Sequence, residues 1–488
     1  MRHTLPADLA TLWRDSPGYE LARSRAFNKR IPPELPHAIV RPKNVEQIQH
    51  AVQLAIDLDK QIRVRSGGHS LAGWTLCADC ILIDLVDFRH MEYDTTTTIV
   101  SASPSTTSAQ LNELLVAHGR FMPFGHCGDV GLGGYLLQGG MGFNCRSYGW
   151  ACEYLVGIDL ITADGEYKHC SESENEDLFW AARGAGPGTS TILSLPSMRL
   201  TNYLGRIPRN CDPVFYPDAT GSRRIREEHL HLARSLFGRG GIVDFEGMDP
   251  LSKSTLSHTE AGSGTQILPE LHADIEPLVI STIIPGPNVA AILVQFLVFL
   301  GTNETGAEKL KLSLTAMPDG TLMEFKGEPT SIQQEYASQE RTMPRDSRYI
   351  CDSVWFKDGI DFVAVTRRMF REFPRDQSMV YWEPLYPTSR RKLPDMAFSL
   401  QADQYLALYA IFEDSQQDEE QSTRIQEFIQ EIKPYVLGTF AADGVPEVRK
   451  SQYWSADVIE RLYSVCQRWD PAHRLGCTLL DPTRKMKF

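Results

Sequence analysis

The chain has 488 residues, of which 42% are hydrophobic and 23% charged, a composition typical of a globular protein with two or three domains. Its formal net charge of −13 argues against a nucleic-acid partner, because proteins that bind phosphate backbones normally present basic surfaces. No window approaches the ~20 uninterrupted apolar residues that a transmembrane helix requires. Residues 1–20 contain no apolar signal-peptide core. We therefore expect a cytoplasmic or otherwise soluble intracellular protein without a membrane partner.

The ten cysteines follow no regular framework, so most are expected to be free thiols. Cys77 and Cys80 form a CxxC pair. A redox or zinc site would need a helix N-terminus or a second cysteine pair near these two residues. The sequence shows neither feature. We interpret the pair as part of a structural loop and predict no metal site.

The first 200 residues mix short strands with helices. Residues 36–70 predict a strand, a helix and a strand, because apolar residues recur at helical spacing from Val45 to Ala55 and an extended "IRVR" follows. Two β-rich stretches and a short amphipathic helix come next, at residues 80–88, 96–104 and 108–119. This region predicts an α+β domain.

After about residue 206, extended stretches alternate with longer helices. The extended stretches cover residues 277–286, 290–301 and 405–414, and the helices cover residues 306–317, 361–373 and 421–436. Several antiparallel strands with helices on one face would fit this pattern. A last helix begins near residue 455 and ends at an Asp-Pro pair.

Two glycine-rich segments are unusual. In "RVRSGGHS", residues 63–70, His69 directly follows two glycines, and residues 124–149 hold nine glycines. Glycine lets main-chain amides face an anion or a flat ring. The second segment is not a dinucleotide fingerprint, because from Gly131 the spacing runs G-x-G-G without a following ribose-binding acid. Apolar residues among the glycines indicate a packed segment rather than a solvated loop.

Together the two segments resemble a known family. "RVRSGGHS" followed by "GHCGDVGLGGYLLQGGMG" is similar to the FAD-binding domain of the vanillyl-alcohol-oxidase (PCMH-type) superfamily, in its berberine-bridge-enzyme-like branch of oxygen-dependent FAD-linked oxidoreductases. "YLVGIDLITADGE" and "NEDLFWAARGAGPGTSTIL" extend the likeness, which returns near "RWDPAHRLG". The resemblance implies an α+β fold in three segments. They are a PCMH-type FAD-binding domain (1–205), an α+β substrate domain with an antiparallel sheet covered by helices (206–445), and a C-terminal segment returning to the FAD domain (446–488).

The resemblance also implies how FAD is held. In the family, the motif histidine is bonded to the flavin 8α-methyl carbon and a cysteine before "VG-x-GG" to flavin C6, positions that correspond to His69 and Cys127. The alternative for His69 is a noncovalent contact. Many relatives have proline after the cysteine, whereas this chain has Gly128-Asp129. By the same carry-over, further cofactor contacts are the backbone amides of Arg65, Ser66, Gly67, Gly68 and Ser70 at the pyrophosphate and ribityl chain, Gly131, Gly134 and Gly142 along the ring and adenine ribose, and Val156 and Ile158 near the adenine.

A flavin accepts hydride, while the protein supplies binding, orientation and a base. In relatives the base is an acid or tyrosine of the substrate-domain strands, or a tyrosine near the C-terminus. The candidates here are Tyr381, Glu383, Tyr405, Tyr409 and Tyr453. Tyr405 and Tyr409 stand four residues apart, so in a strand they share one face. The alternative is that these tyrosines are core residues with hydrogen-bonded hydroxyls.

By register with relatives, Leu155 borders the oxygen pocket, where a bulky residue resembles dehydrogenases and a smaller one oxidases. We predict an FAD-dependent enzyme that oxidises a C–OH group of a sugar, an aromatic alcohol or a secondary metabolite, with molecular oxygen as acceptor. The alternatives are oxidative cyclisation, a dehydrogenase with another acceptor, and a non-catalytic flavin-binding protein. The expected partners are a small-molecule substrate and oxygen, and the oligomeric state stays open.

Overall fold

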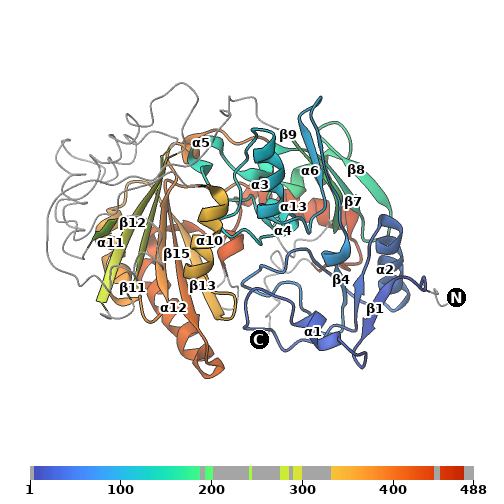
Figure 1. Cartoon of the computed structure of the whole chain (residues 1–488), viewed down its shortest axis with the longest axis horizontal. Helices are drawn as coiled ribbons and strands as arrows, with labels where there is room; N and C mark the ends of the chain where they lie inside the picture. Colours follow the sequence, from blue (N-terminus) through green and yellow to red (C-terminus); the bar gives the residue numbers. More distant parts are fainter. Residues whose placement is uncertain are drawn as a thin grey trace.

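The computed structural model describes residues 5–186, 193–201, 241–243, 275–284, 289–298, 331–444 and 451–476. The helix expected over residues 306–317 lies outside these ranges, as do the predicted segment boundaries near residues 205 and 445. Over the described residues, no helix is both long enough and apolar enough to cross a membrane. Figure 1 shows a seven-stranded sheet with its helices in one half of the molecule and two smaller sheets in the other.

The two smaller sheets come from the N-terminal part of the chain. The four-stranded sheet has the order β1-β2-β4-β3, with the bounds Ala10–Trp13, Ala38–Arg41, Ile81–Asp84 and Ile62–Arg65. The five-stranded sheet has the order β5-β6-β9-β7-β8, with the bounds Met91–Asp94, Ile99–Ala102, Leu193–Thr201, Leu155–Ile161 and Tyr167–Cys170. The helices of this half are α1 (Tyr19–Arg23), α2 (Val45–Asp57), α3 (Ser108–Ala117), α4 (Leu132–Leu137), α5 (Cys145–Tyr148) and α6 (Glu176–Ala182).

The predicted strand–helix–strand unit at residues 36–70 is confirmed as β2-α2-β3. Asn44 begins α2 by accepting a hydrogen bond from the backbone N–H of Gln47. Ile48 and Val52 occupy the buried face of α2 and pack on the sheet. Because β2 and β3 both run parallel to β4, the first glycine-rich motif follows the carboxyl end of a parallel strand. Ligands commonly bind at such strand ends.

The larger sheet is antiparallel. Its order is β10-β12-β11-β14-β15-β13-β16, with the bounds Gly241–Val243, Val289–Val298, Ile275–Ile284, Met379–Pro384, Gln404–Phe412, Arg348–Phe356 and Val436–Gly438. The helices of this half among the described residues are α10 (Ile332–Thr342), α11 (Phe362–Glu372) and α12 (Asp418–Ile432). The last described helix, α13 (Ala456–Trp469), packs against α6 of the N-terminal half.

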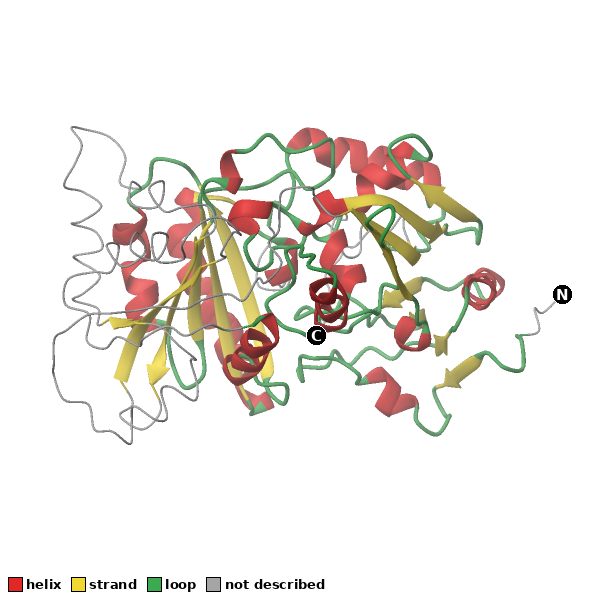
Figure 2. Cartoon of the chain, turned by 45° about the horizontal axis from the view of Figure 1, so that its top comes forward, coloured by secondary structure: helices red, strands yellow, loops and turns green. Residues whose placement is uncertain are grey.

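One face of the large sheet is covered by its own helices. Leu406 and Leu408 of β15 cluster with Phe370 of α11 and Ile429 of α12. Figure 2 shows helices on the outer side of this sheet and the described N-terminal half of the chain on its inner side. The predicted antiparallel sheet with helices on one face is therefore confirmed, and the fold class is α+β.

The inner face carries the tyrosines that the sequence singled out. Tyr405 and Tyr409 alternate with the leucines of β15, so both point inward, as their spacing predicted. In the neighbouring strand β14, Glu383 lies opposite Tyr405, and Met379 lies opposite Tyr409. Tyr381 stands between them on the same face. This face therefore presents polar groups to the N-terminal half of the chain.

Candidate active site

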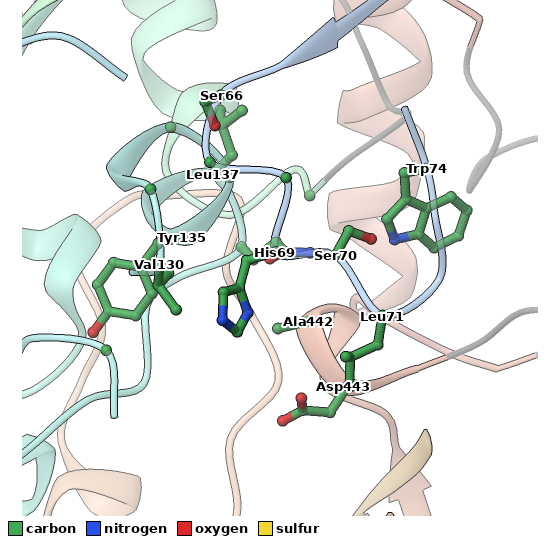
Figure 3. Close-up of a pocket in the computed structure, with 18 of the residues that line it drawn as sticks. Ser66, His69, Ser70, Leu71, Trp74, Val130, Tyr135, Leu137, Ala442 and Asp443 are labelled. Carbon is green, nitrogen blue, oxygen red and sulfur yellow. The ribbon is translucent and has the colours of Figure 1, made fainter. Parts of the chain in front are cut away.

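A cavity of about 300 Å³ lies between the two glycine-rich segments and the inner face of the large sheet. The first motif lines it with Ser66, Gly67, Gly68, His69 and Ser70, the second segment with His126, Cys127, Gly131 and Gly134 among others, and the sheet half with Tyr381, Tyr409 and Asp443. Figure 3 shows His69 and Asp443 among the side chains around this space. The folding of the chain thus brings both glycine-rich segments and two of the candidate bases to one cavity.

The two glycine-rich segments approach each other through their backbones. A β-carbon added at Gly67 would lie 2.6 Å from the backbone nitrogen of Gly131, and one added at Gly131 would lie 2.6 Å from the nitrogen of Gly67. Neither position can carry a side chain unless the backbone moves. At Gly134 a β-carbon would meet no atom within 4 Å, so that glycine leaves open space at the cavity wall. A flat ring or a phosphate chain can approach the backbone of such a wall, and the residues therefore fit FAD.

His69 is held on two sides. Its ring stacks on Phe27 with the centroids 4.0 Å apart. Its Nε2 lies 3.1 Å from Oδ1 of Asp129, and its side chain also hydrogen-bonds to Cys127. Burial lowers the pKa of His69, but the hydrogen bonds to Asp129 and Cys127 outweigh burial and raise the pKa to about 9. The two residues predicted to bond the flavin are therefore in contact with each other at the cavity wall.

Asp443 contributes a carboxylate from the sheet half (Figure 3). The hydroxyl of Tyr405 donates to its Oδ2, and the hydroxyl of Tyr409 also donates to this carboxylate. Burial raises the pKa of Asp443, while the two tyrosine hydrogen bonds and the nearby histidines oppose that rise. Burial, reinforced by the charge of Asp443, raises the pKa of Tyr409 well above its ordinary value. A carboxylate held by two neutral hydroxyls is suited to accept a proton.

A second acid group lies beside the cavity. Tyr381 lines the cavity and donates to Oε2 of Glu383 over 2.8 Å. Nε2 of His126 lies 3.2 Å from Oε1 of the buried Glu276. Burial raises the pKa of Glu383 to about 7, although the charge of His126 opposes this rise. Tyr381 therefore connects the cavity to a buried carboxyl group that titrates near neutral pH.

The possible ligand atoms of His126, Glu276 and Glu383 lie within 4.8 Å of one another, a spacing that could hold a metal ion. Arg146 is buried near them, where burial lowers its pKa to about 10, although the negative charges of the two glutamates oppose this fall. Arg146 and a protonated His126 would balance the two carboxylates without an ion. The absence of a metal site stays a prediction.

Two predicted cofactor residues have other roles in the structure. Arg65 is turned away from the cavity, and its Nη2 lies 2.8 Å from Oδ2 of the buried Asp84. A β-carbon at Gly142 would lie 2.2 Å from the carbonyl oxygen of Phe124, so close packing within the protein accounts for that glycine. Neither residue lines the cavity, and the predicted contacts of the Arg65 backbone amide with the pyrophosphate and of Gly142 with the ring side stay predictions.

Four further candidates also lie outside the cavity lining. Val156 and Ile158 belong to β7, and Ile158 is buried in the core, so their adenine contact stays a prediction. Leu155, which begins the same strand, is buried in the core as well, and its role towards oxygen stays untested. Tyr453 packs against Trp454 with the ring centroids 5.7 Å apart and is not placed as a base.

Asp443 and His126 were missed by the sequence reasoning. Asp443 stands in "AADG", a stretch without a recognisable catalytic pattern. His126 directly precedes Cys127, and that position was the one available signal. His126 lines the cavity from the glycine-rich segment itself, whereas Asp443 reaches it from the half of the chain that holds the large sheet.

Comparison with known proteins identifies the cofactor. A family model described as an FAD binding domain matches residues 36–171. The FAD-linked oxidoreductase ptmO of Penicillium ochrochloron is 75% identical over 489 residues, 100% of both chains. A xylooligosaccharide oxidase of Thermothelomyces thermophilus is 36% identical over 171 residues, 34% of both chains. The solved structure of BBE-like 1 from Physcomitrella patens superposes with a TM-score of 0.74 over 98% of both chains at 17% identity, which shows a shared fold.

The fold and the cavity define an FAD-dependent oxidoreductase of the PCMH type. Within that class, the chain belongs to the family of FAD-linked oxidoreductases that includes ptmO, and it shares its fold with BBE-like 1.

Gly134 offers a direct test of the cofactor cradle. We expect Gly134→Leu to abolish or strongly weaken FAD binding, because its side chain would extend into space that is open in this structure. The thermal stability of the cofactor-free chain should not fall, since leucine favours a helix over glycine by roughly 1 kcal/mol. The absorbance ratio at 450 and 280 nm and a thermal melt measure the two effects. Gly119→Leu, at another glycine with open surroundings but outside the cavity, is the control for FAD content. Normal FAD content in Gly134→Leu would contradict the placement.

Proposed function

We propose that this enzyme oxidises a C–OH group of an apolar or aromatic alcohol, with FAD attached to His69 and Cys127 and molecular oxygen as electron acceptor. The observation that carries the proposal is the Asp443 carboxylate, which lines the FAD cavity and accepts hydrogen bonds from Tyr405 and Tyr409. Bound FAD supplies the acceptor for a hydride. The protein must then hold the alcohol and remove its hydroxyl proton.

Asp443 is the base in this proposal. Because burial keeps Tyr405 and Tyr409 protonated, neither tyrosine is a tyrosinate at neutral pH, and the free acceptor at this point of the cavity is the carboxylate. A substrate hydroxyl would donate its proton to a carboxylate oxygen of Asp443. The two tyrosines fix the carboxylate and stabilise its charge before the proton arrives.

The lining of the cavity favours an apolar substrate. Besides the groups that fit the cofactor, it includes Leu71, Trp74, Met343, Met379 and Phe440. The match to the xylooligosaccharide oxidase covers a third of each chain. It therefore gives no argument about which substrate the large sheet would contact. A sugar would need more hydroxyl partners than these side chains offer. A panel of benzyl, cinnamyl and terpenoid alcohols, with xylobiose for comparison, tests this under air by release of hydrogen peroxide. Faster turnover of xylobiose would reject the apolar class.

The covalent attachment is tested on the denatured protein. We expect yellow colour to remain with the acid-precipitated wild-type chain, and to be lost completely only when His69→Ala and Cys127→Ala are combined. Each single variant should keep one bond, because the two side chains lie together at the cavity wall. Absorbance of the washed precipitate and peptide mass spectrometry measure the result. Ser70→Ala, which alters a lining residue without a predicted bond, is the control. Flavin that washes off the wild type would overturn the covalent attachment while leaving the oxidation proposal open.

A second candidate, oxidative cyclisation, is favoured by the Tyr381–Glu383 pair. This pair gives the cavity an acid–base group separate from Asp443, and ring closure needs proton transfer at two positions of one substrate. Product analysis separates the candidates. A carbonyl product supports simple oxidation, and a product with a new ring supports cyclisation.

A further inference from the structure

Asp129 has a contact that the proposed reaction does not use. It stands two residues after Cys127 in the second glycine-rich segment, and its Oδ1 lies 3.1 Å from Nε2 of His69. Its Oδ2 lies 3.4 Å from Nη2 of the more exposed Arg345. Phe27 covers one side of the imidazole. The ring of His69 is therefore held at Nε2 by Asp129 and on one face by an aromatic side chain, in addition to its hydrogen bond with Cys127.

This arrangement determines which nitrogen of His69 can react. A neutral imidazole carries its proton on one nitrogen and a lone pair on the other. Asp129 is an acceptor, so it favours the tautomer with the proton on Nε2 and leaves the lone pair on Nδ1. The carboxylate also stabilises positive charge on the ring, which is the charge that the imidazole acquires when Nδ1 bonds to carbon.

The bond in question is the proposed link between His69 and the 8α-methyl carbon. Nδ1 supplies the electron pair of the new C–N bond, one C–H bond of the methyl group breaks, and the imidazole releases its Nε2 proton after alkylation. The two electrons left over pass through the ring system to dioxygen, which with two protons becomes hydrogen peroxide. The net change joins the histidine and the cofactor and consumes one dioxygen.

We propose that Asp129 is the positioning residue for covalent attachment of FAD at His69: it holds the Nε2 proton, presents the Nδ1 lone pair to the cavity and stabilises the charge that develops on the ring. This inference rests on the covalent His69 link proposed above. It assigns a role to the residue that follows Gly128, the glycine that stands where many relatives have proline. The inference also predicts different effects on the two flavin bonds. Because Asp129 acts on His69, its replacement should slow formation of the His69 bond and leave formation of the Cys127 bond unchanged.

The experiment compares Asp129→Asn in two backgrounds of the full-length chain, each keeping one bond. Cys127→Ala leaves the His69 bond, and His69→Ala leaves the Cys127 bond. Chains produced in riboflavin-limited cells are mixed with FAD under air at pH 9, and flavin that stays with the acid-precipitated polypeptide is followed over time. The pKa of His69 is about 9 in the wild type, and removing the Cys127 contact lowers it, so at this pH the imidazole of the Cys127→Ala chain is at least about half neutral. The lower pKa expected in Asp129→Asn therefore changes the neutral fraction by no more than about twofold.

We expect Asp129→Asn to slow attachment about tenfold or more in the Cys127→Ala background, the usual range for losing a hydrogen bond to a charged group. Attachment in the His69→Ala background should not change, and Asp129→Glu should restore part of the rate at His69. Quenching of FAD fluorescence gives the noncovalent affinity of every variant, which should stay within about twofold. If His69→Ala cannot form the Cys127 bond, the same affinity measurement shows whether its cavity still binds FAD.

Glu340→Gln in the Cys127→Ala background is the matched control, because Glu340 binds Arg345 over 3.1 Å without contacting His69. It should attach FAD at the parental rate. An unchanged rate in Asp129→Asn with Cys127→Ala would overturn the inference, and so would equal slowing in both backgrounds or a parallel loss of FAD affinity. If Cys127→Ala alone never retains flavin, the His69 link fails together with this inference, a result visible before Asp129 is altered.

Discussion

Asp443→Asn is expected to slow reduction of the bound flavin by an alcohol about 10²–10⁴-fold, the usual contribution of a general base. The amide can still accept hydrogen bonds from Tyr405 and Tyr409, so the geometry should persist, but it cannot take the hydroxyl proton. The rate is measured anaerobically by bleaching at 450 nm, with the alcohol that reduces the wild type fastest among the benzyl, cinnamyl and terpenoid compounds. FAD content should be unchanged.

The pH profile gives the same prediction a second test. Asp443 must be unprotonated to act, so the wild-type rate should fall as the pH drops through its pKa, which burial raises above the ordinary value for aspartate of about 3.9. That acidic limb should be missing from the residual activity of Asp443→Asn. Glu383→Gln is the matched control, since it removes the other carboxyl group near the cavity. A large loss in Glu383→Gln with little change in Asp443→Asn would transfer the role of base to the Tyr381–Glu383 pair.

The parts of this molecule that the sequence predicts well are the ones that local patterns determine. The apolar spacing of α2, the extended "IRVR" and the glycine-rich segments each follow from neighbouring residues. The shared face of Tyr405 and Tyr409 follows from the two-residue repeat of a strand. Together with the resemblance to a known family, these patterns were sufficient for the fold class, the cofactor and two walls of the cavity.

The remaining parts depend on pairings between distant segments. Asp443 becomes a candidate base because a short turn places its carboxylate where the hydroxyls of Tyr405 and Tyr409 in β15 donate to it. No spacing rule connects these residues in the sequence. The direction of the Arg65 side chain is a second case, because β3 pairs with β4 so that Arg65 lies opposite Asp84 and its guanidinium enters a buried ion pair. Strand register brings these two residues together, and register cannot be read from either segment alone.

That ion pair carries the second large effect. Asp84→Ala is expected to lower the free energy of unfolding by about 3–5 kcal/mol, because it leaves the buried Arg65 guanidinium without its counter-charge. Arg25 and Arg41 also bind this carboxylate and would lose the same partner. The shift should appear in the urea unfolding midpoint of the cofactor-free chain as well as with FAD bound. Asp79→Ala, at a half-exposed aspartate that also binds several cations, is the control and should cost about 1 kcal/mol or less.

The pH dependence of stability follows from the same contacts. Burial raises the pKa of Asp84, but the charges and hydrogen bonds of Arg65 and Arg25 outweigh burial and hold the pKa below its ordinary value. A carboxyl group whose pKa is lowered by folding stabilises the protein above its unfolded pKa of about 3.9, and this stabilisation is lost as the pH falls through the folded value. The unfolding midpoint of the wild type should therefore drop more steeply than that of Asp84→Ala as the pH is lowered below about 4. Parallel acid profiles, or a loss of FAD affinity without a loss of stability, would contradict a stabilising role for the Arg65–Asp84 ion pair.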